Sequence, residues 1–83
     1  MDIDFEKLVH DLVTPLVVYP DDLAVKKFSE TEDTVTIQIF VNKEDLGRVI
    51  GRGGRIANAI RTITYAAASR IGKRVNIDID SFE

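Results

Sequence analysis

The stretch EDLGRVIGRGGRIANAIRT, residues 44–62, most constrains what this chain can fold into. It holds four of the five glycines in the chain, and three of them, Gly51, Gly53 and Gly54, fall inside IGRGGR. Apolar residues at helical spacing flank this cluster on both sides. Glycine ends helices and permits backbone conformations that are closed to other residues. The stretch therefore predicts two helices joined by a short, tight loop.

Residues 4–16 carry apolar side chains at the 3.6-residue period and predict an amphipathic helix. Asp2 or Asp4 can cap the start of this helix, because a carboxylate there accepts hydrogen bonds from N–H groups of the first turn. Pro15 has no N–H group and disfavours helical backbone at Thr14, so the helix should end or kink near that point.

Two strands are predicted after this helix, at residues 23–29 and 34–41. The second is the stronger prediction, because apolar and polar side chains alternate along its whole length. The short polar segment between the strands predicts an antiparallel hairpin. With residues 31–33 at the tip of this hairpin, Val25 pairs near Ile39 on the face that points to the core.

The hydrophobic period changes after the second strand, where two helices are expected. Asn42 is a suitable N-cap for the first helix, Asp45 stands where a capping box has its acid, and Gly51 ends the helix. A longer helix is predicted from residue 54 to 71, with its apolar side chains on one broad arc. The residues of this arc are Ile56, Ala59, Ile60, Ile63, Ala66, Ala67 and Ile71.

Residues 74–80 alternate again and predict a final strand. The expected order of elements is α-β-β-α-α-β, within a single domain that spans residues 1–83. The hairpin makes the first two strands antiparallel, and the crossover through two helices makes the second and third strands parallel neighbours. We therefore expect an α+β fold in which three helices lie on one face of a three-stranded mixed sheet.

The charges of the chain are distributed unevenly along its length. Its 11 lysines and arginines and 14 aspartates and glutamates give a net charge of −3. Residues 46–77 contain seven of the basic residues and no acid, so that all the acids lie outside this window. One half of the chain is therefore suited to an anionic partner. A basic face that is merely solvated is the alternative explanation.

Several function classes find no support in the sequence. The chain has no cysteine, so neither a disulfide nor a thiolate metal site is expected. Its acidic start lacks a signal-peptide pattern, and no apolar run approaches the roughly 18 residues of a membrane span, so we expect a cytoplasmic protein. His10 lies among acids on the first helix and is interpreted as a surface residue. We expect neither enzymatic activity nor a cofactor or bound metal.

The glycine loop has the features of a phosphate cradle. A sugar-phosphate chain can approach glycine closely, and the first turn of the following helix offers unpaired N–H groups. Arg52 in the loop, Arg55 in the first turn and Arg48 on the preceding helix add positive charge. A Walker A loop would need Lys-Ser or Lys-Thr after its last glycine, and a dinucleotide fingerprint would need a strand before it. The sequence meets neither requirement.

The segment VIGRGGRIANAI, residues 49–60, resembles the signature V-I-G-x-x-G-x-x-I of the K-homology (KH) domain. The GXXG loop of this domain clamps about four nucleotides of a nucleic-acid backbone. The expected order of elements is that of the type II KH fold. The sequence around the loop, the segment PLVVYPDDLAV and the length of the chain are similar to the small bacterial KhpA family of RNA-binding proteins.

The resemblance implies a role for each residue of the signature. The GXXG loop that would grip the RNA backbone consists of Gly51, Arg52, Gly53 and Gly54. Val49 and Ile50 precede the loop, where they would either line a groove that accepts bases or belong to the core. Ile56 would be a buried packing residue.

The resemblance also implies a function, namely binding of single-stranded RNA without catalysis. The KhpA family is associated with homodimers, with a second KH protein, KhpB, with RNA chaperoning or post-transcriptional regulation, and with control of the cell wall and cell length. A protein-interaction module that recruits an RNA-binding partner is the alternative. A dimer could form at Tyr65 with Ala68 and Ser69, or at Phe28 with Phe40 on the uncovered sheet face.

Overall fold

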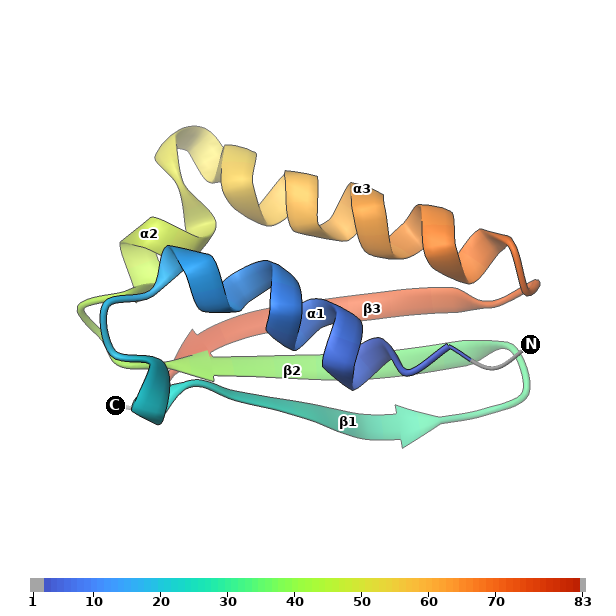
Figure 1. Ribbon diagram of the computed structural model, residues 1–83. Helices are drawn as coiled ribbons and strands as arrows, with labels where there is room; N and C mark the ends of the chain where they lie inside the picture. The colour runs from blue at the N-terminus through green and yellow to red at the C-terminus, as the bar shows by residue number, and fades with distance from the viewer. Residues whose placement is uncertain (1–2, 83) are drawn as a thin grey trace.

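The computed structural model of the chain describes residues 3–82, in which three α-helices cover one face of a three-stranded sheet (Figure 1). The helices are α1 (Phe5–Val13), α2 (Leu46–Ile50) and α3 (Arg55–Ser69). The strands are β1 (Ala24–Glu30), β2 (Thr34–Val41) and β3 (Arg74–Ser81). Short 3-10 helices lie in the connections: η1 (Thr14–Leu16), η2 (Pro20–Asp22) and η3 (Arg52–Gly54). The predicted order of elements and the α+β class are confirmed.

The sheet has the order β1-β2-β3 and the mixed topology expected from the sequence. β1 and β2 pair antiparallel, with Val25 opposite Ile39 as predicted, and the register shifts between Lys27 and Ser29. β2 and β3 pair parallel along their whole length. β3 therefore forms one edge of the sheet, and α3 runs above it in the opposite direction (Figure 1).

The core lies between the helices and the inward face of the sheet. Every second residue of β2 is fully buried there: Val35, Ile37, Ile39 and Val41. One stripe of α1 belongs to the same cluster: Phe5, Val9 and Val13. Removing this apolar surface from water is the main driving force for the fold, at roughly 25 cal/mol per Å².

Both ends of α1 follow from local chemistry. Asp4 is the N-cap, and its Oδ1 accepts a hydrogen bond from the Lys7 N–H at 3.1 Å. Asp2, the other candidate cap, lies outside the described residues. The helix ends at Val13, and Pro15 lies in the 3-10 turn that follows. The predicted break near Thr14 is confirmed.

α3 turns to the sheet a face that only partly matches the predicted arc: Ile60 is buried, and Ile56, Ala67 and Ile71 pack against the core. Its buried residues are Ala57, Ile60, Thr64 and Ala68. The predicted arc left out Thr64, but the Thr64 hydroxyl donates to the Ile60 carbonyl oxygen at 2.8 Å, so that its polar group is satisfied inside the helix. Three residues of the arc are instead exposed and form what we call the outer stripe of α3: Ala59, Ile63 and Ala66.

The start of α2 differs from the predicted capping box. Asp45 rather than Asn42 is the N-cap residue, and its side chain makes no capping hydrogen bond. Asn42 instead closes a tight turn, in which its Oδ1 accepts a hydrogen bond from the Glu44 N–H at 2.9 Å. The prediction was wrong because the Asp45 carboxylate binds backbone groups of a distant segment, at Val18 and Tyr19.

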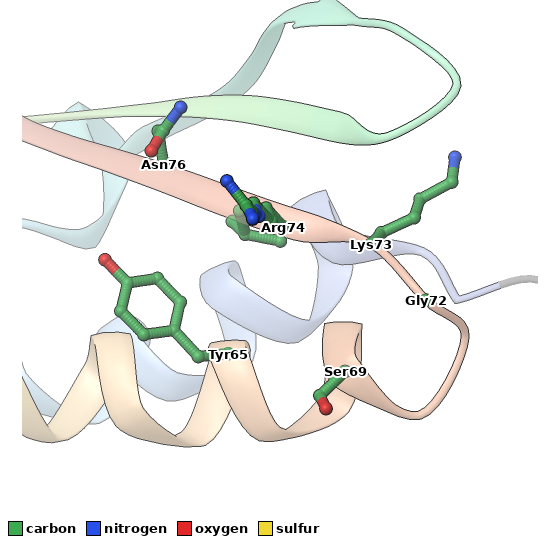
Figure 2. A pocket seen from close by; sticks show the side chains of 7 residues that line it. Tyr65, Ser69, Gly72, Lys73, Arg74 and Asn76 are labelled. Carbon is green, nitrogen blue, oxygen red and sulfur yellow. The ribbon is translucent and has the colours of Figure 1, made fainter.

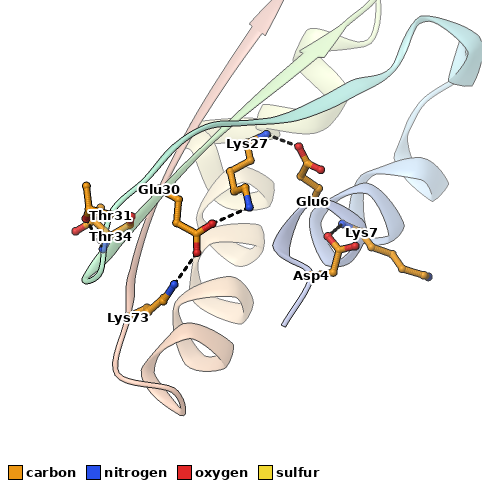
Figure 3. Close-up of polar contacts among 8 residues, drawn as sticks. All are labelled: Asp4, Glu6, Lys7, Lys27, Glu30, Thr31, Thr34 and Lys73. Atoms are coloured by element: carbon orange, nitrogen blue, oxygen red, sulfur yellow. Dashed lines mark hydrogen bonds and ion pairs between the residues drawn. The ribbon is translucent and has the colours of Figure 1, made fainter. Parts of the chain in front are cut away.

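Glu30, at the end of β1, joins the hairpin to the turn before β3 (Figure 3). Its Oε1 accepts a hydrogen bond from Lys27 Nζ at 2.7 Å, and its Oε2 accepts one from Lys73 Nζ at 2.6 Å. The pKa of Glu30 is lowered from 4.5 to about 2. The hydrogen bonds from Lys27 and Lys73 are the main cause, and the positive charges of the two lysines add to the effect. Glu30 is therefore ionised and paired with both lysines at neutral pH.

No helix within residues 3–82 is long and apolar enough to cross a membrane. Within the same range, the acidic and histidine side chains form no group of three or more that could hold a metal ion. His10 is exposed on α1, where its Nδ1 lies 3.2 Å from Thr14 Oγ1.

Candidate nucleic-acid interface

The glycine loop makes a sharp corner between α2 and α3 at one end of the helical layer (Figure 1). Gly51 ends α2 with φ 76° and ψ 170°, a conformation that essentially only glycine adopts. Gly53 and Gly54 have φ values of 64° and 77°, in the left-handed region that favours glycine. The backbone path alone therefore explains why three of the four loop positions hold glycine.

Gly51 has a second reason to be glycine, because its backbone packs against Ile56 in the first turn of α3. A Cβ at position 51 would lie 2.6 Å from Ile56 Cγ1 and 2.9 Å from Ile56 N. Ile56 is partly buried against the core, as expected of a packing residue. Gly51 therefore holds the corner in shape and leaves no room for a ligand beneath it.

Gly53 and Gly54 face open space. A Cβ added at either position would meet no atom within 4 Å. Arg52 and Arg55 are exposed beside them, and neither forms an ion pair with a residue of the described range. The first turn of α3 follows directly, and the N–H groups of Gly54 and Arg55 already donate to the Gly51 and Arg52 carbonyl oxygens. The loop tip thus combines approachable backbone, two cations and the positive end of a helix dipole, which suits a phosphate group.

Arg48 is held within α2 and is not presented at the loop tip. Its Nη1 donates to the Glu44 carbonyl oxygen at 2.7 Å and to Asp45 Oδ1 at 2.9 Å. Its side chain is 50% exposed, so it adds positive charge near the loop although its guanidinium already has a carboxylate partner. The structure therefore groups Arg52 and Arg55 with the glycines and separates Arg48 from them.

The two apolar residues that precede the loop have different surroundings. Val49 is fully buried and belongs to the core cluster. Ile50 is only partly buried. Of the two, Ile50 alone offers surface that a base could contact, and the structure supports the core role that the sequence left open for Val49.

Asp45 anchors the segment between η1 and η2 to the start of α2. Its carboxylate accepts hydrogen bonds at 2.9 Å from the N–H groups of Val18 and Tyr19, in addition to the one from Arg48. Its side chain is completely buried, with 0% exposure. Asp45 therefore sets the position of α2, and with it the position of the loop that α2 leads into.

The surroundings of Asp45 favour its charged form. Burial by itself raises the pKa of the Asp45 carboxyl, but the two backbone hydrogen bonds and the charge of Arg48 together outweigh it, so that the pKa lies below its usual value of 3.8. A buried carboxylate is stable when donors surround it in this way.

The sequence contains one signal that could have identified this anchor. Pro15 and Pro20 bracket a segment that cannot form regular helix, and the backbone N–H groups of such a segment need acceptors elsewhere. An acid at the start of a nearby helix is a suitable acceptor. The capping-box pattern at Asn42 predicted a local role for Asp45 instead of this contact with a distant segment.

Arg61, which the sequence showed only as one of the basic residues, links α3 to β3. Its Nη2 donates to the Ile77 carbonyl oxygen at 3.1 Å, and the side chain is partly buried. Arg61 therefore contributes to helix–sheet packing, halfway along α3 from the loop.

These features can be compared with those of known proteins. Residues 6–79 match the family model described as KhpA/KhpB, KH domain. The chain belongs to the KhpA/KhpB KH-domain family. The RNA-binding protein KhpA of Lactiplantibacillus plantarum is 49% identical over 77 residues, which cover 93% of this chain and 89% of that relative. The RNA-binding protein KhpA of Bacillus subtilis is 43% identical over 74 residues, covering 89% and 90%. The resemblance of the loop segment to a KH signature is thereby confirmed.

The fold of this KhpA/KhpB family member also resembles part of the protein Era. A crystal structure of Aquifex aeolicus Era superposes with a TM-score of 0.72 at 17% identity, covering 98% of this chain and 33% of Era. An Era complex with MgGDPNP and nucleotides 1506–1542 of 16S ribosomal RNA gives a TM-score of 0.67 at 20% identity, covering 93% and 29%. The chain spans about a third of the length of Era, so the likeness concerns the fold of one part of that protein.

Proposed function

We propose that this chain binds single-stranded RNA through the GXXG loop, residues 51–54. The observation that carries the proposal is the open loop tip, where Gly53 and Gly54 leave space for a sugar-phosphate backbone and Arg52 and Arg55 supply charge. The relatives from Lactiplantibacillus plantarum and Bacillus subtilis are named RNA-binding proteins. Era, which shares the fold over part of its length, has been solved in complex with ribosomal RNA.

In this proposal each part of the loop has a different task. Arg52 and Arg55 attract the polyanion, and the missing side chains of Gly53 and Gly54 let about four nucleotides lie against the backbone. The positive end of the α3 dipole favours phosphate at the loop tip. Ile50 contacts a base, while Val49 supports Ile50 from the core and Arg48 adds charge from α2. No step of this binding requires catalysis, a cofactor or a metal.

We further propose that the chain acts as a homodimer or with a KhpB-like KH protein, because a site of about four nucleotides offers few phosphates to a lone domain. The patch at Tyr65 and Ser69 is reduced by the complete burial of Ala68. The outer stripe of α3, with Ile63 48% exposed, is a better apolar surface for self-association. Roles in RNA chaperoning, post-transcriptional regulation, and cell-wall and cell-length control, exerted in the cytoplasm, belong to the same proposal.

The salt dependence of binding tests the proposed function. We expect the purified chain to bind a short single-stranded RNA weakly, with a slope of log K against log[salt] of about −2 to −3, because three or four phosphate contacts each contribute about 0.7 on a single strand. Fluorescence anisotropy of a labelled oligonucleotide over a range of salt concentrations measures this slope. The size of the chain in solution, measured in the same buffers, shows whether the binding unit is a dimer.

The competing function is a KH-like module that recruits an RNA-binding partner through the outer stripe of α3 and does not itself bind RNA. An absence of RNA binding up to millimolar protein, or binding that does not change with salt, would favour this module over the proposal.

A further inference from the structure

A hollow of about 510 Å³ lies between the C-terminal half of α3 and the start of β3. Tyr65 and Ser69 line it from α3, Lys73 from the turn, and Arg74 and Asn76 from β3 (Figure 2). Its size falls within the range of about 300–1,000 Å³ that is usual for ligand sites. The turn that closes it lies at the opposite end of α3 from the glycine loop (Figure 1). The function proposed above makes no use of this hollow.

Tyr65 offers an aromatic surface to this hollow. Its side chain is 43% exposed, and its ring points from α3 toward β3 (Figure 2). Aromatic rings of this kind serve as stacking platforms for unpaired bases, and they accept any base because every base has a π-face. Asn76 on β3 also lines the hollow, although its side chain points away from the Tyr65 ring (Figure 2).

The charge of the hollow favours an anionic ligand. No acidic side chain lines it, since all of its lining residues fall within the acid-free window of residues 46–77. Lys73 is already paired with Glu30 at 2.6 Å, so its charge is neutralised. Arg74 is exposed and forms no ion pair with residues 3–82, which leaves its guanidinium available for a phosphate group.

The hollow is also aligned with the loop. Tyr65 stands 11 residues after Gly54, which places it about 16 Å further along the axis of α3. An extended single strand that is held at the loop and follows α3 covers this distance within a few nucleotides. Arg61, halfway between, adds a positive charge beside that path.

We infer that the hollow is a second subsite for single-stranded RNA, in which a base stacks on Tyr65 while Arg74 binds a phosphate of the same strand. The inference rests on the proposed function, because the strand that reaches the hollow is the one that the loop holds. It adds a contact beyond the four nucleotides at the loop, and it makes affinity depend on the length of the RNA.

The test compares Tyr65→Ala, Tyr65→Phe and wild-type chain on labelled oligoadenylates of about four to ten nucleotides. We expect the wild-type affinity to rise once the strand is long enough to reach Tyr65. On these longer strands Tyr65→Ala should bind about fivefold or more weakly, as expected for the loss of one stacked base. Tyr65→Phe should keep most of the increase in affinity with RNA length, because the aromatic ring stacks on the base and the hydroxyl is not needed. Phe28→Ala is the control, since Phe28 is also an exposed aromatic residue and lies on β1, away from the loop and the hollow.

A spectroscopic measurement locates the contact without relying on affinity. The chain has two tyrosines and no tryptophan, so Tyr65 is the only strong fluorophore in Tyr19→Phe. Stacking of a base quenches tyrosine emission. We expect the long oligoadenylates to quench the emission of Tyr19→Phe, and the shortest to leave it nearly unchanged at the same fraction bound.

The possible failures can be told apart. If the wild-type chain binds no oligoadenylate at any length, both the proposed function and the subsite are wrong. A second outcome is that the wild-type chain binds, while Tyr65→Ala shows the same affinity at every RNA length and the tyrosine emission is not quenched. In that case the subsite is wrong, and the proposed function of the loop is unaffected. Equal losses in Tyr65→Ala and Phe28→Ala would also overturn the subsite, because the loss of affinity would then not be specific to the hollow.

Discussion

Asp45→Ala is expected to lower the melting temperature of the chain by about 10 °C or more. The substitution leaves the partly buried N–H groups of Val18 and Tyr19 without an acceptor and removes the carboxylate partner of the Arg48 guanidinium. An unsatisfied buried donor costs far more than an average hydrogen bond contributes, because it has also lost its contact with water. Thermal unfolding followed by circular dichroism measures the effect.

Two further variants show whether this loss comes from the carboxylate. Asp45→Asn keeps one acceptor oxygen but loses the charge, so its melting temperature should lie between those of wild type and Asp45→Ala. Asp21→Ala removes an exposed acid from η2 and should shift the melting temperature by no more than about 4 °C. If Asp45→Ala had the same melting temperature as Asp21→Ala, the Asp45 anchor would not contribute to stability.

Acid should weaken the same anchor. The folded-state pKa of Asp45 lies below 3.8, the value expected in the unfolded chain. The contribution of the carboxylate to stability is therefore fully present above pH 3.8 and is lost as the pH falls through the lower folded-state pKa. Because Asp45→Asn cannot titrate at this position, the difference in stability between wild type and Asp45→Asn should shrink in this acidic range.

The second large effect is expected at the corner of the loop. Gly51→Ala should destabilise the chain by about 2–5 kcal/mol, because its Cβ would meet Ile56 and its backbone conformation is closed to alanine. Gly53→Ala should cost only about 1–2 kcal/mol, since it introduces a left-handed alanine into open space. Chemical denaturation of the two variants compares the same substitution two positions apart. Equal losses would show that contact with Ile56 does not hold the corner.

Most of the fold could be predicted because most elements have one buried face. The alternation in β2 and the 3.6-residue period in α1 each identify a single stripe, and both stripes are buried in the structure. The buried face of α3 was harder to predict, because apolar side chains cover much of the circumference of this helix. Periodicity alone does not indicate which stripe packs against the sheet. Burial of Thr64 and exposure of Ile63 depend on how the helix packs in three dimensions.

The candidate interface could be predicted only in part, for a related reason. The loop positions stand next to one another in the chain, so a local pattern identified them. The anchor of Asp45 joins residues 26 and 27 positions apart, which a local capping rule does not detect. The different tasks of Gly51 and Gly53 likewise depend on where Ile56 lies, and the pairing of Arg48 depends on Asp45.

The central claim, that RNA binds at the loop, is tested most directly by the double variant Arg52→Asp/Gly53→Asp. Gly53 has open space around its Cβ position, and aspartate tolerates the left-handed conformation better than most residues. The fold should therefore survive, while two negative charges at the tip repel phosphate. Lys26→Asp/Ser29→Asp makes the same change of net charge on the exposed part of β1 and serves as the control.

The measurement is ultraviolet crosslinking of these chains to a labelled single-stranded RNA, with thermal unfolding measured in parallel. It tests whether the RNA binds at the loop. We predict that the loop variant loses crosslinking while its melting temperature stays close to that of wild type, and that the β1 variant still crosslinks. A folded loop variant that crosslinks as strongly as wild type would show that the RNA binds elsewhere on the chain.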